Sequence, residues 1–450
     1  MRILRHILLI ALIALPAKAI DLDLSQVFRT PEFKARFAAS YGFNSSVEPT
    51  ITQEEKQLLE EVAGILATNM PVASIRLLKA TTANSSAALD FTLGNFLFQQ
   101  NKLEDAAAQY RIALKKMPDF LRAHKNLALI QFQQADYKNS LASLLKSLAL
   151  GEVDEMTYGL IGHCHFRLGH NASAESAYRR ALIFGPNNEN WKQGLASTLI
   201  EQRRYAEAAT WLEELLVLKP DRPDLWLAQA DTYLGREDID RAAANYELLR
   251  RMGKASAGSL LNLGDIYVNQ GLPKTAVDTY VEALSNPPLP DLHRMIRVAR
   301  VILEQQHPKA SSRLVTALEQ SYPSKTEDLL RLKSRIAFSQ GDSTAATATL
   351  ESLLEQNPTD GETLILLGDH YAVHEEKEKQ ERAALLYERA SRIDGFAARA
   401  MVKQAIMLVR RNQFEKAVLL LKNAQAIDPK PNVAEYLDRL TRVLAISDQP

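Results

Sequence analysis

The chain of 450 residues contains a single cysteine, Cys164. One cysteine cannot form an intramolecular disulfide, and it cannot supply the thiolates of a cysteine-based zinc site. An excess of charge of one sign is also missing, because 54 Lys and Arg residues balance 54 Asp and Glu residues. No whole-chain basic field can therefore attract nucleic acid or anionic lipid, and we do not expect nucleic acid as a partner.

Short motifs of catalysis and cofactor binding are scarce as well. The sequence has no HExxH or GxSxG motif and no glycine-rich phosphate-binding loop. His163 and His165 are two residues apart, so on a helix they point to nearly opposite sides and cannot share a metal without distortion. We expect His165 to be a core residue. His370 and His374 could face one ion, but a third ligand is not evident. The prediction is a protein that is not an enzyme and has no catalytic residues, metal or cofactor.

The only long apolar run lies at the N-terminus. Arg2 and Arg5 precede the apolar residues 7–15, and Ala17-Lys18-Ala19 follows, which is the pattern of a secretory signal peptide with its cleavage site. An uncleaved membrane anchor is the alternative, but the run is shorter than the roughly 20 residues that span a bilayer. We expect removal of residues 1–19, no remaining transmembrane segment, and a periplasmic or secreted protein. The short signal and the near absence of cysteine favour a bacterial periplasm.

A pattern with a period of 34 residues occupies the middle of the sequence. Small residues, a tyrosine and a proline recur at fixed places, and six consecutive units fit one frame from Ala87 to Pro290 without insertion or deletion. Two units a double period apart show it most clearly: Leu93-Gly94, Leu97, Ala106, Tyr110, Ala113 and Pro118 in one, and Ile161-Gly162, His165, Ala174, Tyr178, Ala181 and Pro186 in the other.

This spacing resembles the tetratricopeptide repeat, a helix-turn-helix unit of 34 residues. The resemblance implies an all-α fold, a right-handed superhelical α-solenoid. Small residues at the eighth and twentieth places would let two antiparallel helices approach closely, and the aromatic or leucine at the twenty-fourth place would fill the space between neighbouring units. Proline near the end of each unit stops the second helix. Because one unit cannot bury its apolar face alone, stability must come from stacking.

The segments before this array are less regular. Residues 20–51 are rich in aromatics and are interpreted as an N-terminal cap on the first repeat; the alternative is a segment that docks in a groove or on a partner. Thr52 to Glu55 forms a capping box that begins a helix. Together with a second helix from Pro71, it predicts a divergent first unit, so that the array of divergent and regular repeats covers residues 52–290.

After Pro290 the pattern loosens. The unit of residues 291–324 keeps Ala310, Leu314 and Ala317 but loses the small residue at its eighth place, and a hinge or bend is one interpretation of this junction. Degenerate and further repeats are predicted over residues 291–431, eleven units in all, and a C-terminal capping helix and tail over residues 432–450.

The resemblance also implies a binding surface. In tetratricopeptide arrays the first helix of each unit lines a concave groove, with its second, fifth, ninth, twelfth and thirteenth places directed inward. A ladder of three phenylalanines at the twelfth place, flanked by cations, suits a peptide with apolar anchors and a carboxylate. The alternative is that the ladder packs between adjacent helices and meets no ligand. The candidate partner-binding residues are Phe91, Asn95, Phe98, Arg122, Lys125, Phe132, His163, Phe166 and Arg167.

These observations predict an exported scaffold for protein–protein or protein–peptide interactions in a bacterial cell-envelope assembly or transport complex. The alternative is a polysaccharide- or peptidoglycan-binding component of an envelope machine, which should expose Trp or Tyr beside carboxamides in the groove. Trp191, Trp211 and Trp226 lie mostly at packing places of the repeat, which disfavours this alternative.

Overall fold

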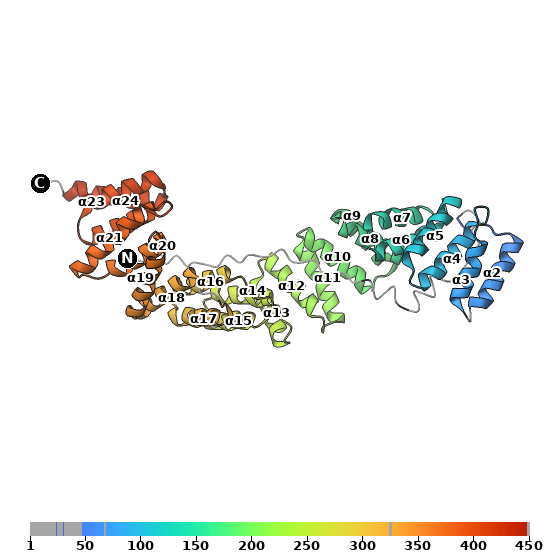
Figure 1. Cartoon of the computed structure of the whole chain (residues 1–450), viewed down its shortest axis with the longest axis horizontal. Coiled ribbons are helices and arrows are strands. Elements are labelled where there is room, and N and C mark those ends of the chain that lie inside the picture. The colour runs from blue at the N-terminus through green and yellow to red at the C-terminus, as the bar shows by residue number, and fades with distance from the viewer. Residues whose placement is uncertain (1–23, 25–29, 31–46, 67–68, 324–325, 448–450) are drawn as a thin grey trace. The chain divides into compact units, whose positions relative to one another are not determined.

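The computed structural model describes residues 24, 30, 47–66, 69–323 and 326–447, and these residues form 23 helices and no strand (Figure 1). The predicted signal peptide, residues 1–19, lies outside them. The helices divide into an N-terminal unit, which ends at residue 254, and a C-terminal unit, which begins at residue 255. None of the described helices is both long and apolar enough to cross a membrane.

Helices of the N-terminal unit form antiparallel pairs. In each pair we call the earlier member the first helix and the later one the second helix. In order along the sequence the unit contains α2 (Gln53–Leu66), α3 (Met70–Ala80), α4 (Ala87–Gln99), α5 (Leu103–Lys116), α6 (Leu121–Gln133), α7 (Tyr137–Ala149), α8 (Glu155–Arg167), α9 (Asn171–Phe184), α10 (Glu189–Glu201), α11 (Tyr205–Leu218), α12 (Pro223–Gly235) and α13 (Ile239–Arg251).

The C-terminal unit continues in the same way and ends on a single helix. It contains α14 (Ala257–Asn269), α15 (Pro273–Leu284), α16 (Leu292–Glu304), α17 (Pro308–Ser321), α18 (Glu327–Gln340), α19 (Thr344–Gln356), α20 (Gly361–Ala372), α21 (Lys377–Ser391), α22 (Ala397–Arg410), α23 (Phe414–Ile427) and α24 (Pro431–Ser447). The first helices from α4 to α14 begin at intervals of 34 residues, which confirms the period read from the sequence. The described residues therefore form eleven helix pairs and a final helix over the predicted capping segment.

Close packing within a pair depends on the small residue at the eighth place. A Cβ atom built on Gly94 would lie 2.6 Å from Cε1 of Tyr110, the residue at the twenty-fourth place of the same pair. The tyrosine of the third regular pair, Tyr178, lies against Gly162 of its own pair and also against Gly194 of the next. The predicted roles of the small and aromatic places are confirmed, because the ring fills the space that the missing Cβ leaves.

Helix ends follow the sequence signals. Thr52 and Glu55 form the predicted capping box: the Thr52 N–H donates to Glu55 Oε2 at 2.9 Å, and the Glu55 N–H donates to Thr52 Oγ1 at 3.2 Å. Pro71 lies in the first turn of α3, as predicted. The turn inside each regular pair has a left-handed residue at the fifteenth place, such as Asn101 (φ 61°) and Gly169 (φ 78°).

The first pair after Pro290 corrects the predicted register by one residue. Gln306 has a φ of 67°, which places the left-handed turn residue one position later than a frame from residue 291 requires. The Ser311 hydroxyl donates to the Ala299 carbonyl at 2.7 Å, as Ser140 does to Ala128 at 2.9 Å in a regular pair. Ala299 is therefore the small residue of the eighth place, which the sequence pattern alone had suggested was lost. The preceding repeat, which contains α14, α15 and the proline-rich connection, is 35 residues long instead of 34, counted between the starts of α14 and α16.

Little of the predicted N-terminal cap, residues 20–51, belongs to the described residues. Leu24 is buried in the core of the N-terminal unit. The Val47 carbonyl accepts a hydrogen bond from the Leu121 N–H at 3.1 Å, at the start of α6. These contacts agree with a segment that packs on the repeats, and the extent of the cap stays a prediction.

Candidate functional site: the first-helix face of the repeats

The phenylalanine ladder of the N-terminal unit lies mostly in the core. Phe98 and Phe132 are 8% and 7% exposed, whereas Phe166 is half-buried. Phe91, also buried, has its ring centroid 4.8 Å from that of Phe120. Packing therefore accounts for three of the four predicted phenylalanines, and Phe166 is the one with a surface that a partner could contact. Binding of a peptide by the ladder stays a prediction.

The ninth place is an internal hydrogen-bonding position. Asn95 Oδ1 accepts a 2.7 Å hydrogen bond from the Tyr110 hydroxyl and a 3.0 Å bond from Asn126 Nδ2. Burial raises the pKa of Tyr110 far above its usual value, so the phenol stays a neutral donor. His163, at the ninth place of α8, is 3% exposed, and its ring lies 5.1 Å from that of Phe132. These two candidate residues contribute to packing between pairs.

The same bond recurs wherever the twenty-fourth place is tyrosine and the ninth is acidic. The tyrosine hydroxyl donates to a carboxylate oxygen across the pair, at distances between 2.5 and 2.8 Å. The pairs are Tyr246 with Asp231 and Tyr280 with Asp265, each 15 residues apart, and Tyr387 with Asp369, which are 18 residues apart because this pair has three additional residues before the tyrosine. A polar residue at the ninth place is thus explained by the partner that it must satisfy inside the pair.

The candidate cations of the N-terminal unit are paired. Arg122 Nε donates to Glu48 at 2.6 Å. Lys125 Nζ donates to Glu152 and, at 2.9 Å, to Asp154, the N-cap residue of α8. Burial lowers the pKa of Lys125, but the two carboxylates outweigh it and raise that pKa above its usual value.

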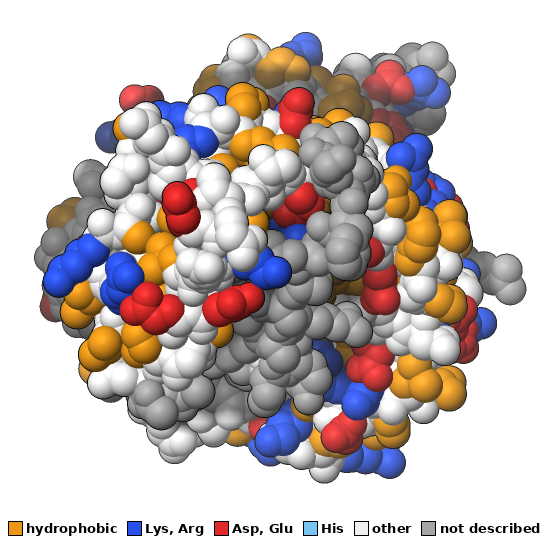
Figure 2. Space-filling view, turned by 90° about the vertical axis from the view of Figure 1, so that its right-hand side faces the viewer, with side chains coloured by type: hydrophobic (Ala, Val, Ile, Leu, Met, Phe, Trp, Pro, Cys, Tyr) orange, Lys and Arg blue, Asp and Glu red, His pale blue; other side chains and the backbone are white. Residues whose placement is uncertain are grey.

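Arg167 differs from these two cations, because it is exposed and its guanidinium lies 4.8 Å from the Tyr137 ring centroid. On the face that Figure 2 shows, Lys and Arg side chains alternate with Asp, Glu and apolar ones among the described residues. Neither sign of charge dominates this view, in keeping with the balanced composition of the protein.

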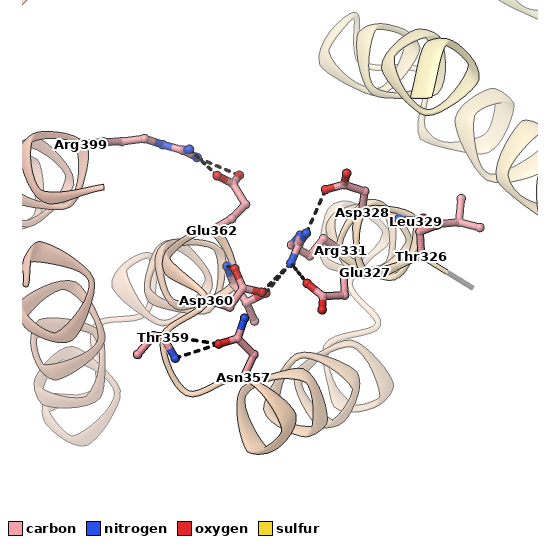
Figure 3. A network of polar contacts seen from close by, with 11 residues as sticks. Thr326, Glu327, Asp328, Leu329, Arg331, Asn357, Thr359, Asp360, Glu362 and Arg399 are labelled. Carbon is pink, nitrogen blue, oxygen red and sulfur yellow. Dashed lines mark hydrogen bonds and ion pairs between the residues drawn. The ribbon is translucent and has the colours of Figure 1, made fainter. Parts of the chain in front are cut away.

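The C-terminal unit contains a charged pocket that the sequence pattern did not predict. We call it the arginine pocket; its volume is about 630 Å³. The lining residues come from four successive first helices and the connections that precede two of them, and Figure 3 shows the polar contacts of several of these residues. The pocket is lined by Arg300, Glu304, Asp328, Arg331, Arg335, Asp360, Glu362, Phe396 and Arg399.

Arg331 forms three ion pairs in the arginine pocket. Its guanidinium donates to Asp360 at 2.5 Å, to Glu327 at 3.1 Å and to Asp328 at 3.0 Å, and its side chain is 14% exposed (Figure 3). Asp360 is also the N-cap residue of α20 and accepts from the Thr363 N–H at 3.2 Å. A cation at the fifth place thus pairs with the N-cap aspartate of the next pair, as Lys125 does with Asp154 in the N-terminal unit.

The other arginines of the pocket differ in how closely they pair with carboxylates. Arg399 forms a two-pronged ion pair with Glu362, with distances of 2.5 and 3.0 Å (Figure 3). Burial raises the pKa of Glu362, but Arg399, together with the charges of Arg300 and Arg335, outweighs it and lowers that pKa below its usual value. Arg335 lies 3.6 Å from Glu304, which is beyond a hydrogen bond. The buried Nε atom of Arg300 has no hydrogen-bond partner among the described residues.

With the register corrected, several residues of the arginine pocket occupy places that line the groove in tetratricopeptide arrays. Asp328 and Glu362 occupy second places, Arg331 a fifth place and Arg300 a ninth place, counted from the first residue of each helix. The sequence frame put Arg300 at a tenth place because, after Pro290, it began one residue early. The available signal was the arginine that recurs 35 residues later as Arg335, at another ninth place.

Histidines do not form a metal site among the described residues. His165, expected in the core, is half-buried, and its Nδ1 lies 3.4 Å from Nδ1 of His170. The His370 ring stacks on Phe338 at 4.0 Å and lies 5.2 Å from that of His374. Within the part of the protein that the structure describes, no three His, Cys, Asp or Glu side chains come together as metal ligands. That the protein is not an enzyme and takes no cofactor stays a prediction.

Family models match three segments of the repeat array. Two models, both described as tetratricopeptide repeat, match residues 165–231 in one case and residues 91–155 and 227–290 in the other. The three segments are tetratricopeptide repeats. The matched segments include eight of the nine candidate residues of the N-terminal groove, all except His163, and end before the arginine pocket.

Curated relatives share only part of their length with this protein. The Hsp70-Hsp90 organizing protein of Triticum aestivum is 33% identical over 105 residues, which are 23% of this chain and 18% of the relative. The RNA polymerase-associated protein CTR9 of Caenorhabditis elegans is 25% identical over 156 residues, 33% of this chain and 14% of the relative. The matched region thus spans less than a fifth of either relative.

Solved structures with similar repeats include a tetratricopeptide repeat protein from Parabacteroides merdae, with a TM-score of 0.36, 18% identity and coverage of 56% of this chain and 100% of that one. YrrB, a tetratricopeptide repeat protein with an unusual peptide-binding site, has a TM-score of 0.36 and 18% identity, over 44% of this chain and 95% of that one.

Proposed function

We propose that this protein is an exported scaffold that binds a protein or peptide partner along the first-helix faces of its tetratricopeptide repeats, within a bacterial cell-envelope assembly or transport complex. The observation that carries the proposal is the arginine pocket, which collects side chains from four successive first helices into one recess. Stacked repeats build extended concave surfaces of this kind, and such surfaces suit an extended or helical segment of a partner.

The proposed location depends on the N-terminal sequence. Arg2, Arg5 and the apolar residues 7–15 have the composition of a secretory signal, and Ala17-Lys18-Ala19 that of a cleavage site. The single cysteine, Cys164, is buried, so its thiol is shielded from oxidation. This agrees with an oxidising compartment.

Binding of polysaccharide is not favoured by the tryptophans. Trp191 is 1% exposed, and its Nε1 donates to Glu155 at 3.0 Å. Trp226 and Trp211 are partly buried against the same core, and Trp226 Nε1 donates to the Pro220 carbonyl at 2.8 Å. Stacking on a sugar requires an open ring face, which these packed residues offer only in part.

A position-specific cross-link tests the proposal. A photoreactive amino acid replaces Asp328, which lies in the arginine pocket and is 42% exposed, and as a matched control replaces Glu388 on the second helix α21, which is 54% exposed. In whole bacteria we expect a discrete adduct in the envelope fraction from position 328 and none from position 388. The mass of the purified protein should correspond to a start at Ile20. Equal adducts from both positions, or a cytoplasmic full-length protein, would contradict the proposal.

A further inference from the structure

The C-terminal unit contains another pocket, which lies at the turns inside two helix pairs and not on the first-helix face. Residues 271–275 and 306–310 line it, and its volume is about 620 Å³. These residues end the turns before α15 and α17 and form the first turns of both helices, which pack side by side (Figure 1). We call it the proline pocket, because both helices begin with proline, Pro273 in α15 and Pro308 in α17.

The two prolines explain why this space is open. The first residue of the second helix is a large one in α5, α7, α11 and α13, namely Leu, Tyr or Ile. Such a residue packs against the next pair: a Cβ on Gly235 of α12 would lie 2.8 Å from Cε2 of Tyr205, the first residue of α11. The proline ring stays close to its own backbone. Pro273 therefore leaves unfilled the space between pairs that a tyrosine occupies in the N-terminal unit.

The walls of the proline pocket are apolar. Leu272, which is 47% exposed, lines the pocket together with the two prolines and Ala310. An apolar cavity of about 150 Å³ is large enough to bind benzene, so this pocket has roughly four times that room. Pockets for small ligands in proteins have volumes of about 300 to 1,000 Å³. A single side chain of a partner would leave most of the space empty, which favours a longer apolar group such as an acyl chain.

The rim of the proline pocket is positively charged. Lys274 and Lys309, the second residues of α15 and α17, are exposed, and no Asp or Glu lines the pocket. Neither ammonium group forms an ion pair within the described part of the chain. The positive ends of two helix dipoles lie at the same rim, and neither helix has a side-chain cap there. An anionic group at the rim is therefore favoured.

We infer that the proline pocket binds a single-chain amphiphile with an anionic head, the acyl chain between Pro273 and Pro308 and the head at Lys274 and Lys309. Apolar walls of this size and a rim of one charge sign are complementary to the two ends of such a molecule. A free fatty acid supplies a carboxylate head and a phospholipid supplies a phosphate. The site lies outside the first-helix face, so the inference goes beyond the proposed function and does not depend on it.

Four ligands with the same dodecyl chain separate the chain from the head: dodecanoate, dodecyl phosphate, dodecanol and dodecyltrimethylammonium. Isothermal titration calorimetry with the full-length protein, below the micelle concentration of each ligand, measures their affinities. We expect an anionic ligand to bind with one molecule per chain and about tenfold or more tightly than dodecanol, less so at high salt, and the cation to bind weakest. The tighter of the two anions identifies the head. Absence of binding by both anions, or equal binding of dodecanol, overturns the inference.

Matched variants assign the binding to this pocket. Pro273→Tyr introduces the residue with which α7 and α11 begin, so it should fill the pocket, lower the affinity about tenfold or more and leave the melting temperature close to that of the parent. The control is Pro431→Tyr, which changes the exposed first residue of α24, outside the pocket. An unchanged affinity in Pro273→Tyr, or an equal loss in the control, overturns the inference.

The two lysines are tested separately, because exposed side chains can be changed without affecting the fold. Lys274→Gln and Lys309→Gln should each weaken the anionic ligand several-fold and leave dodecanol unchanged. Equal effects on both ligands contradict the assignment of the head to the rim.

A side chain of a protein partner is the competing occupant. A photoreactive amino acid at Leu272 that yields a protein adduct in whole bacteria, while no dodecyl ligand binds the purified protein, overturns the inference. The adduct from position 328 is unaffected by either result, so the scaffold function stands or fails separately.

Discussion

Truncation of Phe132 decides whether the phenylalanine ladder is core or binding surface. The ring is 7% exposed, with its centroid 5.6 Å from that of Tyr137 and 5.1 Å from that of His163. Phe132→Ala deletes a buried ring between two helix pairs, and such changes cost about 3 to 5 kcal/mol of unfolding free energy. Phe166→Ala removes a half-buried ring, so we expect a loss of roughly half that size.

Tryptophan fluorescence during urea unfolding is the assay. Trp191, Trp211 and Trp226 are the three tryptophans of the protein, and all lie on α10 to α12, so the signal reports the N-terminal unit alone. If the ladder instead anchors a peptide, Phe132→Ala should weaken binding of the peptide by about 2 kcal/mol or more and leave stability unchanged. If Phe132→Ala unfolds at the parental urea concentration and loses its envelope partner, the assignment of Phe132 to the core is refuted.

Two further predictions concern the N-terminal unit. Gly94→Ala should destabilise it by roughly 1 to 3 kcal/mol, since the new Cβ would meet the Tyr110 ring at 2.6 Å. The control is Gly64→Ala on α2, which should be neutral or stabilising because a Cβ there meets nothing within 4 Å. Equal effects of the two substitutions on urea unfolding would contradict the packing account. Burial raises the pKa of Asp154, but Lys125 and the hydrogen bonds from Thr157 outweigh it, and the pKa falls to about 2. Since this folded-state pKa is below the unfolded one, the stabilisation is present above about pH 4 and is lost as the pH falls toward 2. Unfolding curves of Asp154→Asn and the parent should therefore differ at neutral pH and converge in acid, and a constant difference would refute the ion pair.

Most of the fold followed from residue spacing because the repeat is a local unit. Gly94 and Tyr110 belong to one hairpin, so the place of each in the sequence determines their contact whatever the rest of the protein does. The capping box of Thr52 and Glu55 is likewise contained in one turn. Prediction was wrong in the repeat after Pro290, where one additional residue moved the small place to Ala299, because a fixed frame cannot detect a changed connection length.

The candidate site was harder to predict because burial is not periodic. The resemblance to tetratricopeptide arrays predicts an inward twelfth place in every unit, yet Phe98 and Phe132 are covered by neighbouring residues while Phe166 keeps an exposed surface. Lys125 has the sequence signature of a groove cation, and only the approach of Glu152 and Asp154 from the next pair shows that it is paired. Such contacts join residues about one repeat apart, and side-chain length and rotamer decide them.

The sequence by itself determined the helix pairs, their turns and the repeat family, because spacing, small residues and caps act within one hairpin. Only the tertiary structure decided which inward places remain available to a partner. Arg331 and Arg300 are both arginines at groove places of neighbouring first helices, and nothing in their residue type separates them. The Nε atoms of both are buried without a hydrogen-bond partner among the described residues. They differ at the terminal nitrogens, because the stacking of successive pairs brings Asp360 to Arg331, whose terminal nitrogens also donate to Glu327 and Asp328.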